Sequence, residues 1–336
     1  MLNSFNQKRQ TLEESKLTIV RLDRLDVAVL RELTQAQMVL PGRPGMKPSN
    51  REISRKLRVP PATVRYRLKG MYNAGIIKGS SVFPNPNLLG LKMGAYTLDV
   101  PPMQDKDEVV RRLSMVDGAV NMHNFVGSLV WVTFLYENDL ALERKMDEMN
   151  EAAGAQGILS HVPFPPCTAT LTRQEAALII RLSERGFDSY GALARELGIS
   201  VRTLERRLSK LARTAAVISL PNLDYHKIKG SVPADLLILF MDSDAAKMSQ
   251  KTILPLVGET VIFAALWDVV GLCSLILPNV ASAGELAEKV RRVEGVATAR
   301  VEIVRDHVDR VGLLGSYFEK RMETEGPTAY AHVLST

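Results

Sequence analysis

Basic and aromatic residues recur on one face of a predicted helix between Pro61 and Asn73. The apolar residues of this stretch return every three or four positions, so they form a separate face that should lie in a core. Guanidinium and ammonium groups neutralise phosphates, and the second helix of a helix-turn-helix enters the major groove of DNA. Arg65 and Tyr66 suit base edges or the sugar-phosphate backbone. The predicted DNA contacts are Ala62, Thr63, Arg65, Tyr66, Arg67, Lys69 and Lys78.

A second stretch, around residues 200–213, has the same character. Its predicted DNA contacts are Arg202, Thr203, Arg206, Arg207 and Arg213. Glu205 lies beside them and either accepts a hydrogen bond from a cytosine amino group or repels phosphate. Arg67 and Arg207 border the apolar faces, where a salt bridge within the protein is an equal expectation. The two helices should therefore read different sequences, or else one reads the sequence and the other only holds the DNA, and the first is expected to be more important for specificity.

Residues that would indicate catalysis are scarce. The chain has no nucleophile with a paired base, no metal-ligand spacing and no glycine-rich phosphate loop. His161 and Cys167 are near neighbours, but two potential ligands make a weak metal site. From the residues alone we expect no catalytic residue, no metal and no cofactor, so the chain is not expected to be an enzyme.

The elements that position these residues occur twice. Ser49–Met71 aligns with Ser189–Leu211 without a gap at an offset of 140 residues, so that Leu57 falls over Leu197 and Leu68 over Leu208. The apolar positions are kept while the polar ones differ, as expected for two copies of one packed unit. The chain should therefore present two recognition helices, in the manner of a dimer, and further association through its sheets is an additional expectation.

Each half is predicted to be a winged helix-turn-helix followed by β-α-β-β-α-β, an α+β tandem repeat with ferredoxin-like domains. The expected helices outside the two stretches above are Arg21–Leu33, Lys106–Met115, Asn138–Ala153, Ala245–Leu254 and Ala281–Val293. The expected strands are Met93–Val100, Val120–Phe125, Leu129–Tyr136, Ile158–Phe164, Pro233–Met241, Thr260–Trp267, Val270–Leu277 and Ala297–Val304. The expected units are an extension (1–20), the first helix-turn-helix (21–90) with its α/β domain (91–168), the second helix-turn-helix (169–230) with its α/β domain (231–308), and a charged tail (309–336).

Composition narrows the possible classes. Residues 49–80 contain eight basic residues and one acidic residue, whereas residues 99–160 contain five basic and eleven acidic residues. Such local concentration of positive charge is the electrostatic footprint of nucleic-acid binding. The two cysteines, Cys167 and Cys273, fit a reducing cytoplasm. The apolar run Val261–Leu277 contains Asp268 and Gly271, so it is predicted as two buried strands and not as a membrane span.

The chain resembles the leucine-responsive (Lrp/AsnC, feast/famine) regulators. The resemblance rests on Leu22–Asp26, Ser49–Ile53, Pro61–Leu68 and Gly75–Ile77, and on Pro84-Asn85 with Leu89-Gly90. It spans about residues 21–165 and recurs more weakly over about 172–305. It implies a winged helix-turn-helix joined to an α/β oligomerisation domain, double-stranded DNA as partner, and amino acids or related metabolites as effectors.

Departures from the family pattern leave two other functions open. A Gly/Pro-rich loop from Thr34 to Pro48 is inserted between the first two helices, and the strand turns at Phe125–Ser128 and Trp267–Gly271 differ from the family's hairpin. Siroheme decarboxylases share this fold plan and use His and Arg residues to hold the carboxylates of a tetrapyrrole. His123 fits that alternative, although a histidine packed in a strand is the simpler interpretation. A protein-binding scaffold is the third possibility.

Overall fold

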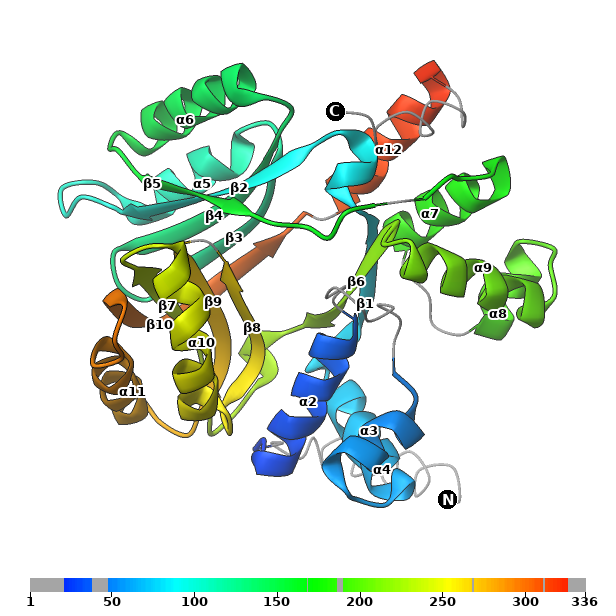
Figure 1. The fold of residues 1–336 in the computed structure, drawn as a ribbon, viewed down its shortest axis with the longest axis horizontal. Coiled ribbons are helices and arrows are strands. Elements are labelled where there is room, and N and C mark those ends of the chain that lie inside the picture. Colours follow the sequence, from blue (N-terminus) through cyan, green and yellow to red (C-terminus); the bar gives the residue numbers. More distant parts are fainter. Residues whose placement is uncertain are drawn as a thin grey trace, which may run out of the picture.

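The computed structural model describes residues 21–37, 48–167, 169–185, 190–267, 269–310 and 312–325 (Figure 1). The predicted extension 1–20 lies outside the described residues. The predicted loop after the first helix begins later than expected, because the helix continues through Thr34 to Gln37. Most of the rest of that loop also lies outside the described residues.

Three helices form each of the two helix-turn-helix modules. They are α2 (Arg24–Gln37), α3 (Asn50–Leu57) and α4 (Pro61–Asn73) in the first, and α7 (Arg173–Arg185), α8 (Tyr190–Glu196) and α9 (Val201–Arg213) in the second. The α3 helix begins at a capping box in which Ser49 and Glu52 satisfy each other's backbone N–H groups. Pro61 opens α4, where a missing N–H had no helical partner to lose.

The two α/β regions follow the same order of elements. The first contains β2 (Lys92–Asp99), α5 (Lys106–Met115), β3 (Ala119–Phe125), β4 (Leu129–Tyr136), α6 (Asp139–Ala153) and β5 (Ile158–Val162). The second contains β7 (Val232–Phe240), α10 (Ser243–Val257), β8 (Val261–Trp267), β9 (Val270–Leu277), α11 (Ala281–Arg291) and β10 (Val296–Asp309). Short 3-10 turns, η1 (Pro86–Leu89) and η2 (Tyr225–Lys227), precede the two regions. The fold class is α+β, as expected.

One eight-stranded antiparallel sheet runs through both regions in the order β5-β2-β4-β3-β10-β7-β9-β8. The long strand β10 joins the halves, because its first part pairs with β7 and its last part with β3. The helices cover the outer faces, and the inner faces of the two half-sheets meet in a small core that includes Phe125, Trp131 and Leu272. Strand alternation puts apolar side chains on both faces, so each half-sheet is buried on both sides.

The predicted wings are replaced by a ribbon between the halves. We expected Lys78 to lie on a local hairpin, but β1 (Ile77–Pro84) pairs antiparallel with β6 (Val217–Leu223) of the other half. A sequence pattern predicts that a segment is a strand but not which strand it pairs with. Pairing with a strand some 140 residues away therefore leaves the same pattern as a local hairpin. In Figure 1 this β1–β6 ribbon crosses the middle of the molecule, between the modules and the sheet.

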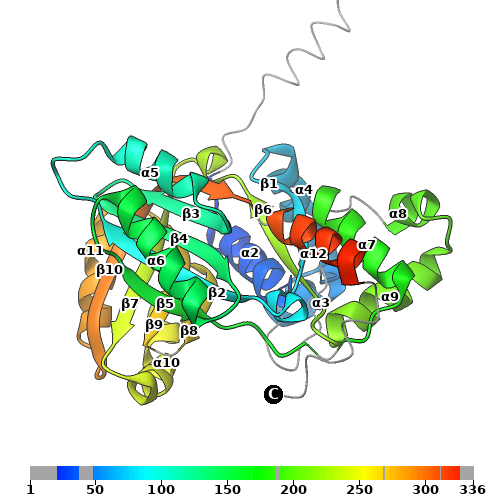
Figure 2. The same ribbon diagram turned by 90° about the horizontal axis from the view of Figure 1, so that it is seen from above.

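Each module packs against the half-sheet of the opposite half. The first module shares a core with Ile262 and Ile276, whereas the second shares one with Val120 and Leu135. The predicted charged tail is also partly a helix, since α12 (Gly312–Glu325) lies against α7 and buries Leu314 and Phe318 (Figure 2). The halves are therefore interlocked.

The apolar run at residues 261–277 forms the two strands β8 and β9, which confirms that prediction. Among the residues that the structure describes, no helix has the length and hydropathy needed to cross a bilayer.

A candidate active site between the half-sheets

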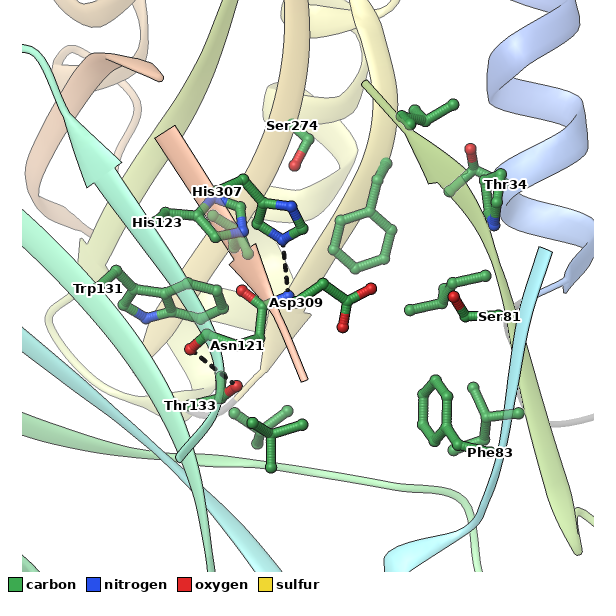
Figure 3. A pocket seen from close by; sticks show the side chains of 18 of the residues that line it. Thr34, Ser81, Phe83, Asn121, His123, Trp131, Thr133, Ser274, His307 and Asp309 are labelled. Atoms are coloured by element: carbon green, nitrogen blue, oxygen red, sulfur yellow. Dashed lines mark hydrogen bonds between the residues drawn. The ribbon is translucent and has the colours of Figure 1, made fainter. Parts of the chain in front are cut away.

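The site lies where the β1–β6 ribbon faces the inner surface of the sheet. A cavity of about 210 Å³ is enclosed there, and about 1100 Å³ is free of protein atoms when its open mouth is included. In Figure 3, Asn121, His123, His307 and Asp309 lie on one wall. Thr34, Ser81 and Phe83 lie opposite them, on α2 and on the ribbon. The lining is mostly apolar and aromatic, with few polar groups, which is the usual composition of a small-molecule site.

A buried histidine–aspartate pair forms the polar centre of this wall. Nδ1 of His123 lies 2.5 Å from Oδ2 of Asp235, and the two side chains are 7% and 1% exposed. A carboxylate buried to this degree needs a donor. When Nδ1 donates its proton to Asp235, the other ring nitrogen, Nε2, is the one left to interact with a ligand.

His307 stands next to His123 and is held neutral. The two ring centroids are 4.8 Å apart, and Nε2 of His307 lies 2.9 Å from Nδ2 of Asn121. Burial and, to a smaller extent, the neighbouring His123 lower the pKa of His307 to about 4. The carboxylate of Asp235 acts in the opposite direction and raises it. At neutral pH, His307 therefore accepts the proton of the Asn121 amide.

Strand register places these residues in one row. His307 of β10 is the cross-strand partner of His123 of β3, and His123 is the partner of Trp131 of β4. Directly opposed side chains on one face lie close together, so three strands deliver two imidazoles and an indole to the same wall. The Trp131 indole meets His123 edge to face at 5.2 Å. Asp235 comes from β7, on the facing half-sheet.

The pair occurs in only one of the two halves. Trp131 pairs with His123 in the first half, and at the matching place in the second half Leu272 pairs with Ala265. Asp235 pairs with Ser274, and its counterpart Ala95 pairs with Thr133. Two alanines thus fill the equivalent positions without difficulty, so the fold itself does not require the histidine and the carboxylate.

The predicted DNA contacts of the first module fall into two groups. Ala62, Arg65, Tyr66 and Lys69 are exposed on α4, with Tyr66 76% exposed, and Thr63 is half-buried. Within the described part of the chain, neither Arg65 nor Lys69 has an ion-pair partner. Arg67 instead binds Asp23 at 2.7 Å and Asp26 at 3.1 Å.

Lys78 and the second module show the same division. Lys78 binds Asp224 at 2.9 Å, and Arg207 donates to the side-chain oxygen of Gln174. Arg202, Arg206 and Arg213 are exposed on α9, and Thr203 is half-buried at its first turn, where its N–H is capped by Ser200. The structure therefore brings Arg65 and Lys69 together on one surface, and Arg206 and Arg213 on another.

Sequence reasoning noticed His123 but missed Asp235 and His307. Asp235 interrupts a run of apolar residues in β7, which is a local signal for a buried charge, but it names no partner. His307 and Asp309 lie in a part of β10 that we expected to end at Val304. Nothing in the sequence indicates that this strand continues and joins β3.

Burial raises the pKa of both cysteine thiols, Cys167 and Cys273. Burial, with Asp235 nearby, raises the pKa of the Cys273 thiol to about 12, so this cysteine stays protonated. Among the described residues, no group of three or more His, Cys, Asp or Glu side chains is placed to hold a metal ion.

No protein-family model matches the chain, and no curated protein sequence matches it. Among solved structures, siroheme decarboxylase NirDL bound to an iron-uroporphyrin III analogue is similar over 90% of this chain and 99% of its own, with 11% identity and a TM-score of 0.47. AsnC of E. coli is similar over 45% of this chain and 99% of its own, with 20% identity and a TM-score of 0.30. The leucine response regulatory protein LrpA of Mycobacterium tuberculosis covers 43% of this chain, with 20% identity and a TM-score of 0.28.

These findings correct one expectation. The absence of sequence motifs led us to expect that the chain is not an enzyme, but the structures that match 90% of it belong to an enzyme, whereas the regulators match less than half. The candidate residues His123, Asp235 and His307 are far apart in the chain and meet only in the folded sheet, so no sequence motif contains them.

Proposed function

We propose that this chain is a decarboxylase acting on a carboxylated tetrapyrrole of the siroheme type, bound in the cavity between the ribbon and the half-sheets. The observation that carries the proposal is the buried His123–Asp235 pair beside a neutral His307, present in one half only. The cavity itself has a volume of about 210 Å³ and opens to solvent, so a ligand of tetrapyrrole size would place one edge in the cavity and extend through its mouth.

The chemistry follows from the wall. Decarboxylation breaks the bond between a side-chain carbon and its carboxylate, carbon dioxide leaves, and the electron pair left on the carbon takes up a proton. His123 supplies that proton from Nε2, while Asp235 stabilises the imidazolium and holds the ring in place. The apolar lining favours the reaction, because the substrate exchanges a poorly solvated carboxylate for a neutral gas.

The test is turnover of siroheme under anaerobic conditions, with loss of carbon dioxide followed by mass spectrometry. Replacement of the proton donor (His123→Gln) should lower turnover by about 10²-fold or more. His161→Gln is the matched control, since the exposed side chain of this histidine on β5 hydrogen-bonds to Tyr136 and is not part of the cavity lining, and it should leave turnover unchanged. A wild-type protein that neither binds nor converts siroheme would overturn the proposal.

We propose a second function, duplex DNA binding by the exposed face of α4, because its two cations have no partner within the described residues. Here Arg65 and Lys69 neutralise backbone phosphates, and Tyr66 stacks on sugar or base edges. The double variant Arg65→Ala, Lys69→Ala should weaken binding of a labelled duplex. The dependence of log K on log salt should become shallower by about two, one per lost phosphate contact. An unchanged salt dependence would remove α4 from the interface.

A further inference from the structure

The second module carries an open cleft between the start of α7 and the outer side of α9, with a volume of about 600 Å³. Five cationic side chains surround it, with Glu175 as the one carboxylate. The cations are Arg173, Arg206, Arg207, Lys210 and Arg213. This cleft, called the α7–α9 cleft below, lies at the far end of the molecule from α11 (Figures 1 and 2).

Contacts inside the cleft leave most of its positive charge unneutralised. Glu175 is 4% exposed and is already bound by Lys210 at 2.8 Å and by the N–H of Thr172 at 2.8 Å. Burial acts to raise the pKa of Glu175, but these contacts outweigh it and lower the pKa, so the carboxylate is ionised at neutral pH and neutralises one cation only. Arg173 and Arg206 are exposed and have no ion-pair partner among the described residues.

The first module has the same framework without the charge. Asp23 and Asp26 cap the start of α2 as Thr172 and Glu175 cap the start of α7. In the first module, however, the carboxylates of Asp23 and Asp26 both bind Arg67 and neutralise its positive charge. At an offset of 140 residues, the places of Arg206, Lys210 and Arg213 are taken by residues without positive charge, namely Tyr66, Gly70 and Asn73.

The cleft also differs in direction from the α4 surface. Arg65 and Lys69 correspond to Glu205 and Ser209, so the basic strip of α4 has no basic counterpart at these positions of α9. Arg206 is one residue further along, which on a helix is a rotation of about 100°. The cleft cations of α9 are therefore centred on a different side of their helix from Arg65 and Lys69 of α4, although Arg202 lies on the side that corresponds to Lys69.

We propose that the α7–α9 cleft is a phosphate-binding site confined to the second module. Four arginines with planar, multidentate donors suit phosphate oxygens, and the N-terminal end of α7 adds partial positive charge. Phosphate comes from two sources, the backbone of a nucleic acid or a free polyphosphate. The site does not depend on the catalytic proposal.

Two probes test the site on the full chain: inorganic tripolyphosphate, by calorimetry, and a labelled 30-base-pair duplex, by fluorescence anisotropy across a salt series. The double variant Arg206→Ala, Arg213→Ala should weaken tripolyphosphate binding about tenfold or more, and should lower the salt slope for the duplex by about two. Lys289→Ala, Arg292→Ala removes the same charge from the region of α11 and should change neither measurement.

The pattern of results identifies the source. Competition of tripolyphosphate with the duplex for the cleft indicates a nucleic-acid backbone, whereas tripolyphosphate binding without duplex binding indicates a free polyphosphate; both support the site. Arg206→Lys, Arg213→Lys keeps the charge and should keep most of the salt slope, which guards against misfolding. Binding of neither probe, or the same loss in the α11 control, would overturn the proposal.

Discussion

At the scale of single residues, the cavity wall shows how a fold can hold groups that it does not need. Asp235 is almost fully buried and stays compatible with folding because His123 donates to it. Sequence alone could suggest His123 as a candidate, because a polar ring stands out in an apolar strand. It could not pair His123 with Asp235, since 112 residues and a sheet junction separate them.

The lowered pKa of His307 makes stability depend on pH. An unfolded histidine has a pKa of about 6.5, whereas the native side chain has one of about 4. As the pH falls, the unfolded state therefore takes up this proton first, and the contribution of His307 to stability, complete above about pH 6.5, is lost towards pH 4. In His307→Gln, urea unfolding should show a smaller loss of unfolding free energy over this interval. The same loss in both proteins would contradict the assignment.

At the scale of elements, local signals succeeded where their cause is local. The spacing of Val64, Leu68 and Met71, with Pro61 at the start, predicted α4 with the bounds that the structure has. The same reasoning wrongly predicted β1 as part of a local wing, because the sequence of a strand does not show which other strand will pair with it. It also left residues after Gly312 as a tail, although α12 buries Leu314 and Phe318 there.

The α12 helix should be essential to the second module. Phe318 is fully buried against α7 and its neighbours, so Phe318→Ala should lower the free energy of unfolding by about 3–5 kcal/mol. The adjacent exposed residue, Glu319, gives a control. Glu319→Ala should change the free energy of unfolding by less than about 0.5 kcal/mol. Chemical denaturation measures both. Equal, small effects would show that α12 is dispensable.

At the scale of the whole molecule, each module packs against the half-sheet of the opposite half, and this crossed packing determines how the chain unfolds. The sequence predicted a repeated order of elements, but it did not predict the crossed packing, because apolar residues at a module surface fit either half-sheet. Ile276 serves the first module and Leu135 the second, each from the opposite half. No module keeps its full core when the other half unfolds.

This interlocking predicts a single unfolding transition for the described fold. Ile276→Ala, in the core of the first module, and Phe318→Ala, in that of the second, should each lower the temperature of the same calorimetric peak. Ile276 is 3% exposed, so its truncation is expected to reduce stability by about 2–5 kcal/mol. Two separate peaks, each responding to one variant only, would show that the halves unfold independently.

The β1–β6 ribbon affects how the cavity depends on protein concentration. Both strands belong to one polypeptide, so the wall that carries Ser81 and Phe83 and the wall that carries His123 meet at an effective concentration fixed by the chain. A cavity assembled from separate subunits would come apart at low protein concentration, as mass action requires. Here one chain supplies both walls, so their meeting does not depend on protein concentration.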